Sequence, residues 1–187
     1  MKKLLALGVA LAVSAPAFSN DGLFVGIGIG NTKLSYDYKD NYFGESGSDS
    51  ESDTSFYIRG GKFFRDDIRA YVDLTKVDYD GADQLSVTAS VDKLFPVAEQ
   101  VDLYIGGSLG YISLDLEEAS KESGVLYGAQ AGALFKANKN IDVDFGFSYL
   151  LSTAEFKDSE EIMGTIYTNK VEFTDLMTFK VGVNYRF

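Results

Sequence analysis

The chain has 187 residues, of which 28 are acidic and 17 are basic, and its formal net charge at pH 7 is −11. A chain this acidic repels a phosphate backbone, so the composition argues against nucleic-acid binding. It contains no cysteine and no histidine. Disulfide bridges are therefore excluded, and the usual general base of catalysis near neutral pH is missing.

The first residues predict a secretory signal peptide. Two lysines precede an apolar run that begins at Leu4 and ends near Ala15, and small residues follow. The run of about 12 residues is too short for a membrane-spanning helix, which needs roughly 20. We predict that residues 1–19 are the signal peptide, with cleavage after Ser19 or, as the alternative, after Ala17.

The rest of the chain, residues 20–187, predicts one all-β domain. Apolar and polar residues alternate in eight successive segments. The first three are LFVGIGIGNTKLSY, TSFYIRGGKFFR and DIRAYVDLTK. The next four are QLSVTASVDKLF, VDLYIGGSLGYI, GVLYGAQAGALFK and NIDVDFGFSYLL, and the eighth runs from about Phe173 to Phe187. A period of two is typical of strands with two different faces. Each segment matches the roughly 9–11 residues of a tilted membrane-spanning strand.

The connections between these segments alternate in length. Short ones fall at 66–67, 96–100 and 137–140, and longer ones at 37–53, 115–123 and 154–172, with an intermediate one at 78–83. This alternation predicts an eight-stranded antiparallel up-and-down transmembrane β-barrel, with short periplasmic turns and long extracellular loops. Within the loops, residues 44–52 are small and polar and predict a flexible exposed segment. Asp80 and Gly81 predict a hairpin turn rather than a calcium loop.

The two faces of the strands predict opposite environments. The apolar face carries long side chains and is expected to meet lipid, whereas the face rich in Gly, Ser, Thr and charge is expected to line a narrow interior. The alternative is a soluble eight-stranded barrel with these faces reversed. On the lipid face we expect an outer aromatic girdle of Phe56, Tyr111, Tyr149 and Phe173, and a periplasmic girdle of Phe64, Phe95, Phe135, Tyr185 and Phe187. Lys62 and Lys93 share that face next to short turns.

Ten charged residues fall on the inward phase. The cations are Arg59, Arg69, Lys136, Lys180 and Arg186, and the anions are Asp73, Asp92, Asp102, Asp142 and Asp144. Buried charges persist only when they are paired and hydrogen-bonded. We therefore predict a salt-bridged interior network of Arg59, Arg69, Asp73, Asp144 and Lys180 that packs and closes the barrel. The alternative is an ion pathway or gate.

The end of the chain carries the most specific motif. Lys180, Gly182, Tyr185 and Phe187 resemble the β-signal that closes the last strand of outer-membrane proteins. The whole predicted domain resembles the small eight-stranded outer-membrane barrels, such as the OmpA-like transmembrane domain and OmpX-like proteins, and GLFVGIGIG is similar to their first strand. The resemblance implies the cell outer membrane of a Gram-negative bacterium, surrounding lipid and lipopolysaccharide, and handling by periplasmic chaperones and the barrel-assembly machinery.

The sequence leaves several roles open. Enzymes among such barrels depend, by resemblance, on a histidine that this chain lacks, so we expect no enzymatic activity, no catalytic residue, no metal site and no cofactor. The acidic loops predict a structural or surface role in envelope integrity or adhesion, with a host or cell-surface ligand as the partner. In particular, Ile162, Met163 and Ile166 in the last loop could extend the sheet beyond the membrane. The alternative is a narrow porin-like channel for ions or small solutes.

Overall fold

Nearly all of the described chain is β-strand. The computed structural model describes residues 22–40, 45–65, 67–79, 82–116, 122–162 and 165–187, with side chains left aside between 156 and 170. Its strands are β1 (Leu23–Asp40), β2 (Glu45–Phe64), β3 (Ile68–Tyr79), β4 (Ala82–Ala98), β5 (Val101–Leu116), β6 (Glu122–Lys136), β7 (Ile141–Ser152), β8 (Glu155–Ile162) and β9 (Thr165–Arg186). The predicted signal peptide and the turn at Asp80 and Gly81 lie outside the described residues.

The described residues include no helix that is long and apolar enough to span a membrane.

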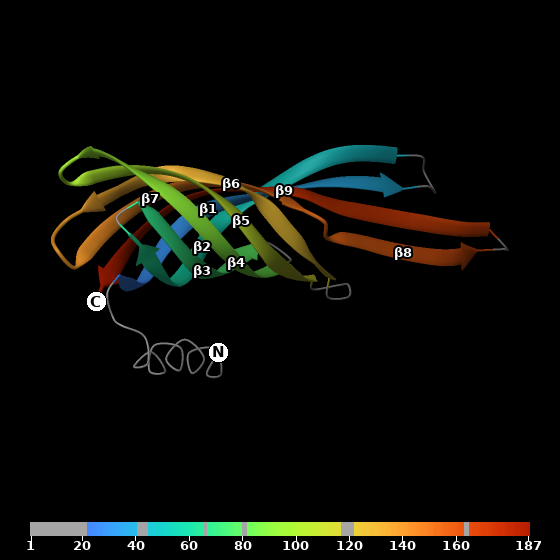
Figure 1. Ribbon diagram of the computed structural model, residues 1–187. Helices are drawn as coiled ribbons and strands as arrows, with labels where there is room; N and C mark the ends of the chain where they lie inside the picture. Colours follow the sequence, from blue (N-terminus) through green and yellow to red (C-terminus); the bar gives the residue numbers. More distant parts are fainter. Residues whose placement is uncertain (1–21, 41–44, 66, 80–81, 117–121, 163–164) are drawn as a thin grey trace, which may run out of the picture.

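Antiparallel pairing closes the sheet on itself (Figure 1). Each of β1 to β6 pairs with the next strand, β7 pairs with β9, and β9 pairs back with β1. Eight strands therefore form the closed barrel, which confirms the predicted fold class, and β8 is an added strand on the free side of β9. The closing seam is regular near the chain end, where Phe187 N donates to Leu23 O over 3.0 Å.

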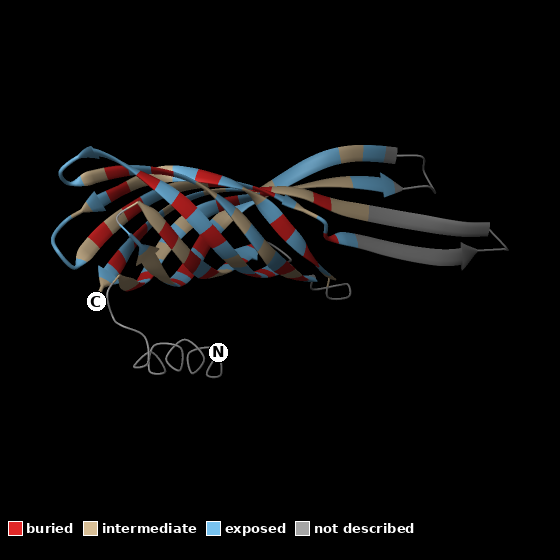
Figure 2. Ribbon diagram, viewed as in Figure 1, coloured by how far each residue is buried: buried red, intermediate tan, exposed pale blue. Residues whose placement is uncertain are grey.

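Burial alternates along the barrel strands, as Figure 2 shows in its red and blue bands. Outward side chains are apolar and open, such as Ile27 at 67% exposure and Phe179 at 65%. Inward side chains include charged ones that are fully buried, such as Arg69 at 0%. The alternative of a soluble barrel with reversed faces is therefore wrong, because the charges are inside and the long apolar chains outside.

The outward apolar side chains form a band that ends at polar positions. On β1 the apolar outward series stops at Asn31, on β3 at Lys76 and on β4 at Asp83. Toward the other end the band reaches the short turns that follow β2, β4 and β6. This height of apolar surface, bounded by polar positions, is the signature of a membrane-spanning barrel.

Two strands continue where we expected a loop. β1 and β2 remain paired beyond the barrel, up to Asp40 opposite Glu45, so residues 37–40 and 45–53 are strand and the prediction of a loop there is wrong, while residues 41–44 lie outside the described ones. Pairing of backbone amides does not require an apolar face, and alternating Tyr36 and Tyr38 support it on β1. The other long connections are shorter too, since β5 reaches Leu116 and β6 begins at Glu122.

In the outer half of β9, the side chains point to the face opposite to the one that simple alternation along the strand predicts. A register shift between Ser35 and Tyr36 places Asp175 opposite Ser35 but Phe173 opposite Tyr36, so Thr174 is the extra residue. Such a bulge moves the residues of β9 that precede Thr174 to the other face of the sheet. Phe173, expected in the outer aromatic girdle, is consequently buried inside at 6% exposure.

Beyond the barrel, four strands form one sheet, which we call the outer sheet. It consists of the outer parts of β2, β1 and β9 together with β8, in that order (Figure 1). β8 pairs with β9 from Glu155 opposite Glu172 to Ile162 opposite Thr165. The suggestion that the last loop could extend the sheet thus holds for its backbone, whereas the side chains of Ile162, Met163 and Ile166 lie outside the described ones.

Candidate functional site

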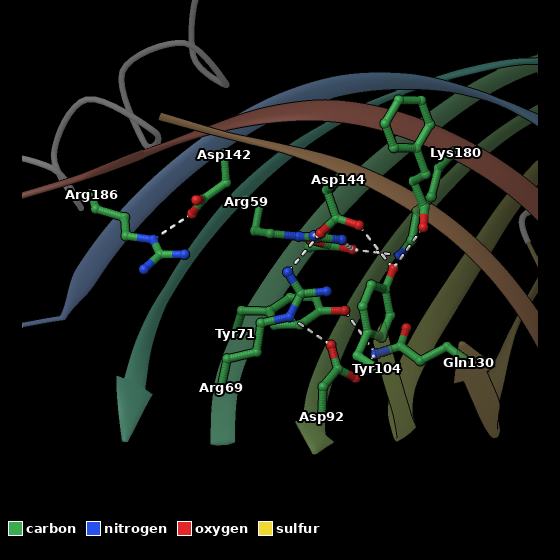
Figure 3. Close-up of polar contacts among 12 residues, drawn as sticks. Arg59, Arg69, Tyr71, Asp92, Tyr104, Gln130, Asp142, Asp144, Lys180 and Arg186 are labelled. Atoms are coloured by element: carbon green, nitrogen blue, oxygen red, sulfur yellow. Dashed lines mark hydrogen bonds and ion pairs between the residues drawn. The ribbon is translucent and has the colours of Figure 1, made fainter. Parts of the chain in front are cut away.

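A network of charged side chains crosses the middle of the barrel (Figure 3). Arg59 donates to both carboxylate oxygens of Asp73, over 2.6 and 2.8 Å. Arg59 Nη1 and Arg69 Nη1 each donate to Asp144 Oδ2 over 2.7 Å. Lys180 Nζ donates to Asp73 over 3.1 Å. The structure therefore brings together all five residues proposed from the sequence for the interior network.

Register and closure explain how these residues meet. Arg59 on β2 lies opposite Asp73 on β3, and Arg69 on β3 lies opposite Asp92 on β4. Asp144 comes from β7 on the far wall, so its bonds to the two arginines tie opposite sides of the barrel. Such long-range pairs exist only once the sheet has closed.

Four further residues belong to the network and were missing from the proposed set. Arg69 Nε donates to Asp92 over 2.7 Å, and Gln130 Nε2 donates to Asp92 over 2.6 Å and to Tyr71 Oη over 2.7 Å. Tyr104 Oη donates to Asp144 over 2.8 Å. The sequence did contain a signal for such residues. Aromatic and amide side chains stand out at inward positions, where the other residues are small or charged.

Arginine side chains also stack on the inward tyrosines. The guanidinium carbon of Arg59 lies 4.0 Å from the ring centre of Tyr71, and that of Arg69 lies 4.3 Å from the ring centre of Tyr104. These contacts cover the faces of the guanidinium groups, and hydrogen bonds occupy the edges of Arg59, whereas Nη2 of Arg69 has no partner in the described structure. The side chains of Arg59 and Arg69 are thereby fully buried, at 0% exposure.

The charges of the network balance. Three cations, Arg59, Arg69 and Lys180, face three carboxylates, Asp73, Asp92 and Asp144. Toward the end with the short turns, the other inward charges pair as well, Lys136 with Asp102 at 2.8 Å and Arg186 with Asp142. All ten inward charges therefore have an opposite partner, as burial requires.

Two tyrosines each occupy the space above a pair of glycines. Tyr57 lies over Gly28 of β1 and Gly182 of β9, where a Cβ would overlap its phenol. Tyr104 lies in the same way against Gly132 of β6 and Gly146 of β7. Glycine is needed at these positions for close approach rather than for backbone freedom. The Tyr57 pair spans the closing seam between the first and last strands.

The outer end of the interior is apolar. A cluster of ten buried side chains fills it, namely Leu34, Val77, Tyr79, Ile112, Leu114, Leu126, Leu150, Ala154, Phe173 and Leu176. The expectation of a polar interior is therefore wrong at this end. The strands have left the lipid band here, so the inward face becomes the only place where apolar side chains avoid water.

A small polar cavity separates this apolar cluster from the charge network. It has a volume of about 40 Å³ and is lined mainly by hydroxyl groups, with Lys180 and Asp73 on one side and Leu126, Leu150 and Leu176 on the other. Ser55 Oγ and Tyr57 Oη are buried there without a hydrogen-bond partner in the described structure. The volume suits a few water molecules and no larger solute.

The outer sheet presents aromatic and acidic groups side by side. On the face that continues the barrel interior, Tyr36 lies opposite Asp49 and Phe173, and Tyr38 lies opposite Gly47, with its ring over that glycine. Tyr38 is 41% exposed. Burial and the nearby carboxylates of Asp49 and Glu51 raise the pKa of Tyr36.

At the opposite end, the turn after β2 holds a charged pair. Lys93 on β4 donates to the carboxylate of Asp67. This hydrogen bond lowers the pKa of Asp67, whose carboxylate is otherwise open to solvent. The turn also contains Arg65, whose backbone is left-handed with φ of 61°.

A closed barrel with a balanced charged interior and an apolar outer band defines an integral β-barrel membrane protein. Residues 4–187 match the family described as outer membrane protein beta-barrel domain, and the chain belongs to that family. It is accordingly an outer-membrane protein surrounded by outer-membrane lipid, which confirms the resemblance and the location expected from the sequence.

Solved structures share this fold. Neisserial surface protein A is 19% identical with a TM-score of 0.61, covering 89% of this chain and 98% of its own. OprG from Pseudomonas aeruginosa is 16% identical with a TM-score of 0.62, covering 89% and 96%. OprH from P. aeruginosa is 21% identical with a TM-score of 0.56, covering 89% and 99%. At these identities the likeness is one of fold. A comparison with curated proteins found no match.

Proposed function

We propose that the protein is a closed, non-enzymatic barrel that holds the outer sheet at the cell surface, with a structural role in envelope integrity or adhesion. The observation that carries this proposal is the filled interior. The charge network, the apolar cluster and the small cavity between them occupy successive levels of the barrel. A barrel of eight strands is just wide enough to be filled in this way. What remains accessible to a partner is the outer sheet.

The outer sheet suits a surface role because its faces and one edge are accessible. The outer part of β2 lies beyond its last pair with β3, Ser55 opposite Val77. Along this stretch the backbone N–H of Ser50 donates to the side chain of Asp49 over 2.7 Å. An edge that bonds to its own charged side chains resists uncontrolled pairing with other chains. We therefore place a host or cell-surface ligand on the sheet face that carries Tyr36 and Tyr38.

We expect no enzymatic activity, on chemical grounds. The chain has no histidine, and the inward carboxylates that could act as acids or bases are held in ion pairs. A general base must reach a substrate proton within hydrogen-bond distance, and a cavity of about 40 Å³ admits no substrate.

The chain terminus has an assembly role in this proposal. Lys180, Gly182, Tyr185 and Phe187 form the signal that the barrel-assembly machinery recognises, after periplasmic chaperones have delivered the chain. Tyr185 and Phe187 point outward with exposures of 48% and 58%, and their rings meet at 5.3 Å. Replacing both aromatic residues by alanine should leave refolding into detergent intact while reducing insertion by the purified machinery. Equal loss in both assays would contradict a recognition role.

Single-channel conductance of the refolded protein in a planar bilayer tests the closed barrel. We expect no discrete current steps from the wild type. Arg59→Ala serves as the companion variant because it removes the residue that bonds both Asp73 and Asp144. Discrete wild-type steps that change in this variant would mean that the interior charges line an open path.

A narrow channel is the second candidate function. The hydroxyl-lined cavity favours it, since Ser55 Oγ and Tyr57 Oη need solvent partners. In this case the apolar cluster would be the barrier. Leu126→Ser with Leu150→Ser should then raise conductance, because both residues line the cavity on its outer side. If these variants remain silent while folded, the channel candidate fails.

Adhesion is tested by shortening the outer sheet. Removing residues 156–170, which carry the β8–β9 hairpin tip, should lower binding of cells that display the protein to host cells while leaving the barrel folded. A matched display strain with a shortened periplasmic turn at 137–140 controls for general damage. Equal binding by both strains would contradict a role of the outer sheet.

A further inference from the structure

Two lysines interrupt the lipid-facing band near the short turns. Lys62 on β2 and Lys93 on β4 both lie on the outward phase of their strands. Lys93 is held by Asp67. Lys62 makes no hydrogen bond or ion pair with any residue in the described part of the chain. A charge on the lipid face costs free energy that depends on depth, so an anion at the membrane surface would stabilise a cation there.

The position of Lys62 is deeper than the neighbouring aromatic ring. Phe64 follows two residues later on the same face, toward the turn, and is 50% exposed. One alternation step corresponds to about 7 Å along a strand. A lysine stem can cover such a distance by snorkelling. The ammonium group of Lys62 thus reaches the level of the periplasmic headgroups while its stem stays against the barrel wall.

A strip of two small outward residues, Gly60 and Ala70, begins beside Lys62, whereas the larger Ile68 lies beside Lys93. Lys62 lies opposite Ala70 on β3, and Lys93 lies opposite Ile68 on the same strand. Gly60, the next outward position on β2, has no atom within 4 Å of the place where a Cβ would stand. Larger side chains, Val72 and Val91, border this strip and are exposed. The strip of Gly60 and Ala70 therefore runs from the level of Lys62 toward the middle of the band.

We propose that this surface binds one phospholipid of the periplasmic leaflet, with its phosphate between Lys62 and Lys93 and an acyl chain along Gly60 and Ala70. The two lysines flank β3 and lie opposite positions two residues apart on it, so two strand spacings across and two residues along separate their Cα atoms by about 12 Å. Flexible lysine stems on both sides can therefore converge on one phosphate above β3. Lys93 has three donors, and Asp67 uses one of them and holds the amine at the headgroup level.

The required ligand chemistry is a phosphate monoanion on a diacyl body. Phosphatidylglycerol and phosphatidylethanolamine both carry it, whereas diacylglycerol has the same acyl chains without the phosphate. Lys139 provides a matched control, because it is an exposed lysine in the turn after β6, at the same end of the barrel and on different strands from the two lysines.

The experiment is native mass spectrometry of the refolded full chain, titrated in detergent with phosphatidylglycerol, phosphatidylethanolamine or diacylglycerol of identical acyl chains. We expect the wild type to retain one phospholipid. Lys62→Gln combined with Lys93→Gln should weaken retention by about tenfold, the scale expected for losing two partly exposed ion pairs. Lys139→Gln should leave retention unchanged, and Lys62→Arg with Lys93→Arg should restore it. Heat-induced mobility shifts on gels report that each variant is folded.

Three results would overturn the proposal. Diacylglycerol could be retained as well as phosphatidylglycerol, which would mean apolar association alone. The double Lys→Gln variant could retain phospholipid as the wild type does, or Lys139→Gln could lose it equally, which would mean a general charge effect. If the double Lys→Gln variant fails to fold, the variant with Lys62→Arg and Lys93→Arg still tests the proposal. Folded protein of this variant that does not retain phospholipid would contradict a phosphate site.

Discussion

Carboxylates make very different interactions in the middle of the barrel and in the outer sheet. In the middle, Asp144 accepts hydrogen bonds from Arg59, Arg69 and Tyr104, and its removal would leave three donors without their acceptor. In the outer sheet, Asp49 accepts one bond from the next residue in the chain and is exposed. The difference shows that position relative to the membrane, rather than residue type, determines what a carboxylate contributes.

The sharpest test of this contrast is the same substitution in both regions. Asp144→Asn should lower the free energy of unfolding by about 3–5 kcal/mol, because it leaves the buried network with one uncompensated positive charge. Asp49→Asn should change the free energy by less than about 0.5 kcal/mol. Equilibrium urea unfolding in lipid vesicles measures both. Similar values for the two variants would contradict the claim that position relative to the membrane determines what a carboxylate contributes.

The two tyrosines over glycine pairs allow a finer test. Tyr104→Phe should destabilise the barrel by about 1.5–3 kcal/mol, because it removes a hydrogen bond to a charged acceptor. Tyr57→Phe should cost less than about 0.5 kcal/mol, since the Tyr57 hydroxyl has no partner in the described structure. The same unfolding assay distinguishes them. A larger loss in Tyr57→Phe would indicate a partner in the cavity.

Space at the closing seam can be tested with alanine. Gly182→Ala should destabilise by about 1–3 kcal/mol, the usual range for overpacking. Its Cβ would overlap Tyr57 Oη and lie 2.8 Å from the carbonyl oxygen of Ile27. Gly60→Ala is the control, because nothing lies within 4 Å of its Cβ position, and alanine there should be neutral or slightly stabilising. Thermal refolding yield and unfolding midpoints in vesicles report both variants.

The smallest effect is expected at the turn after β2. The pKa of Asp67 is lowered in the folded protein by its hydrogen bond from Lys93. Its contribution to stability is therefore present above the unfolded pKa, near 4, and is lost as the pH falls through the lower folded pKa. Asp67→Asn should lower the unfolding midpoint slightly at pH 7, and this difference should shrink as the pH falls below about 4 and vanish once Asp67 is protonated in the folded protein. A difference that persists in acid would contradict the ion pair as its cause.

The sequence predicted the barrel well because alternation is a local property. Ile27 and Arg59 could each be assigned to a face from their neighbours alone. The partners of Asp144 could not be assigned, since they lie on strands that meet only after closure. Phe173 was misplaced because one extra residue, Thr174, reverses the facing of all residues before it. The continuation of β1 and β2 was missed because backbone pairing leaves little trace in a Ser- and Asp-rich segment.

The balance of the interior network has an electrical consequence. Arg59, Arg69 and Lys180 carry as much positive charge as Asp73, Asp92 and Asp144 carry negative charge. A membrane potential does work of about 2.3 kcal/mol per elementary charge per 100 mV, but a neutral cluster that moves as one body has no net charge for the field to act on. The barrel therefore carries no gating charge at its centre, and an applied voltage should leave its closed state undisturbed.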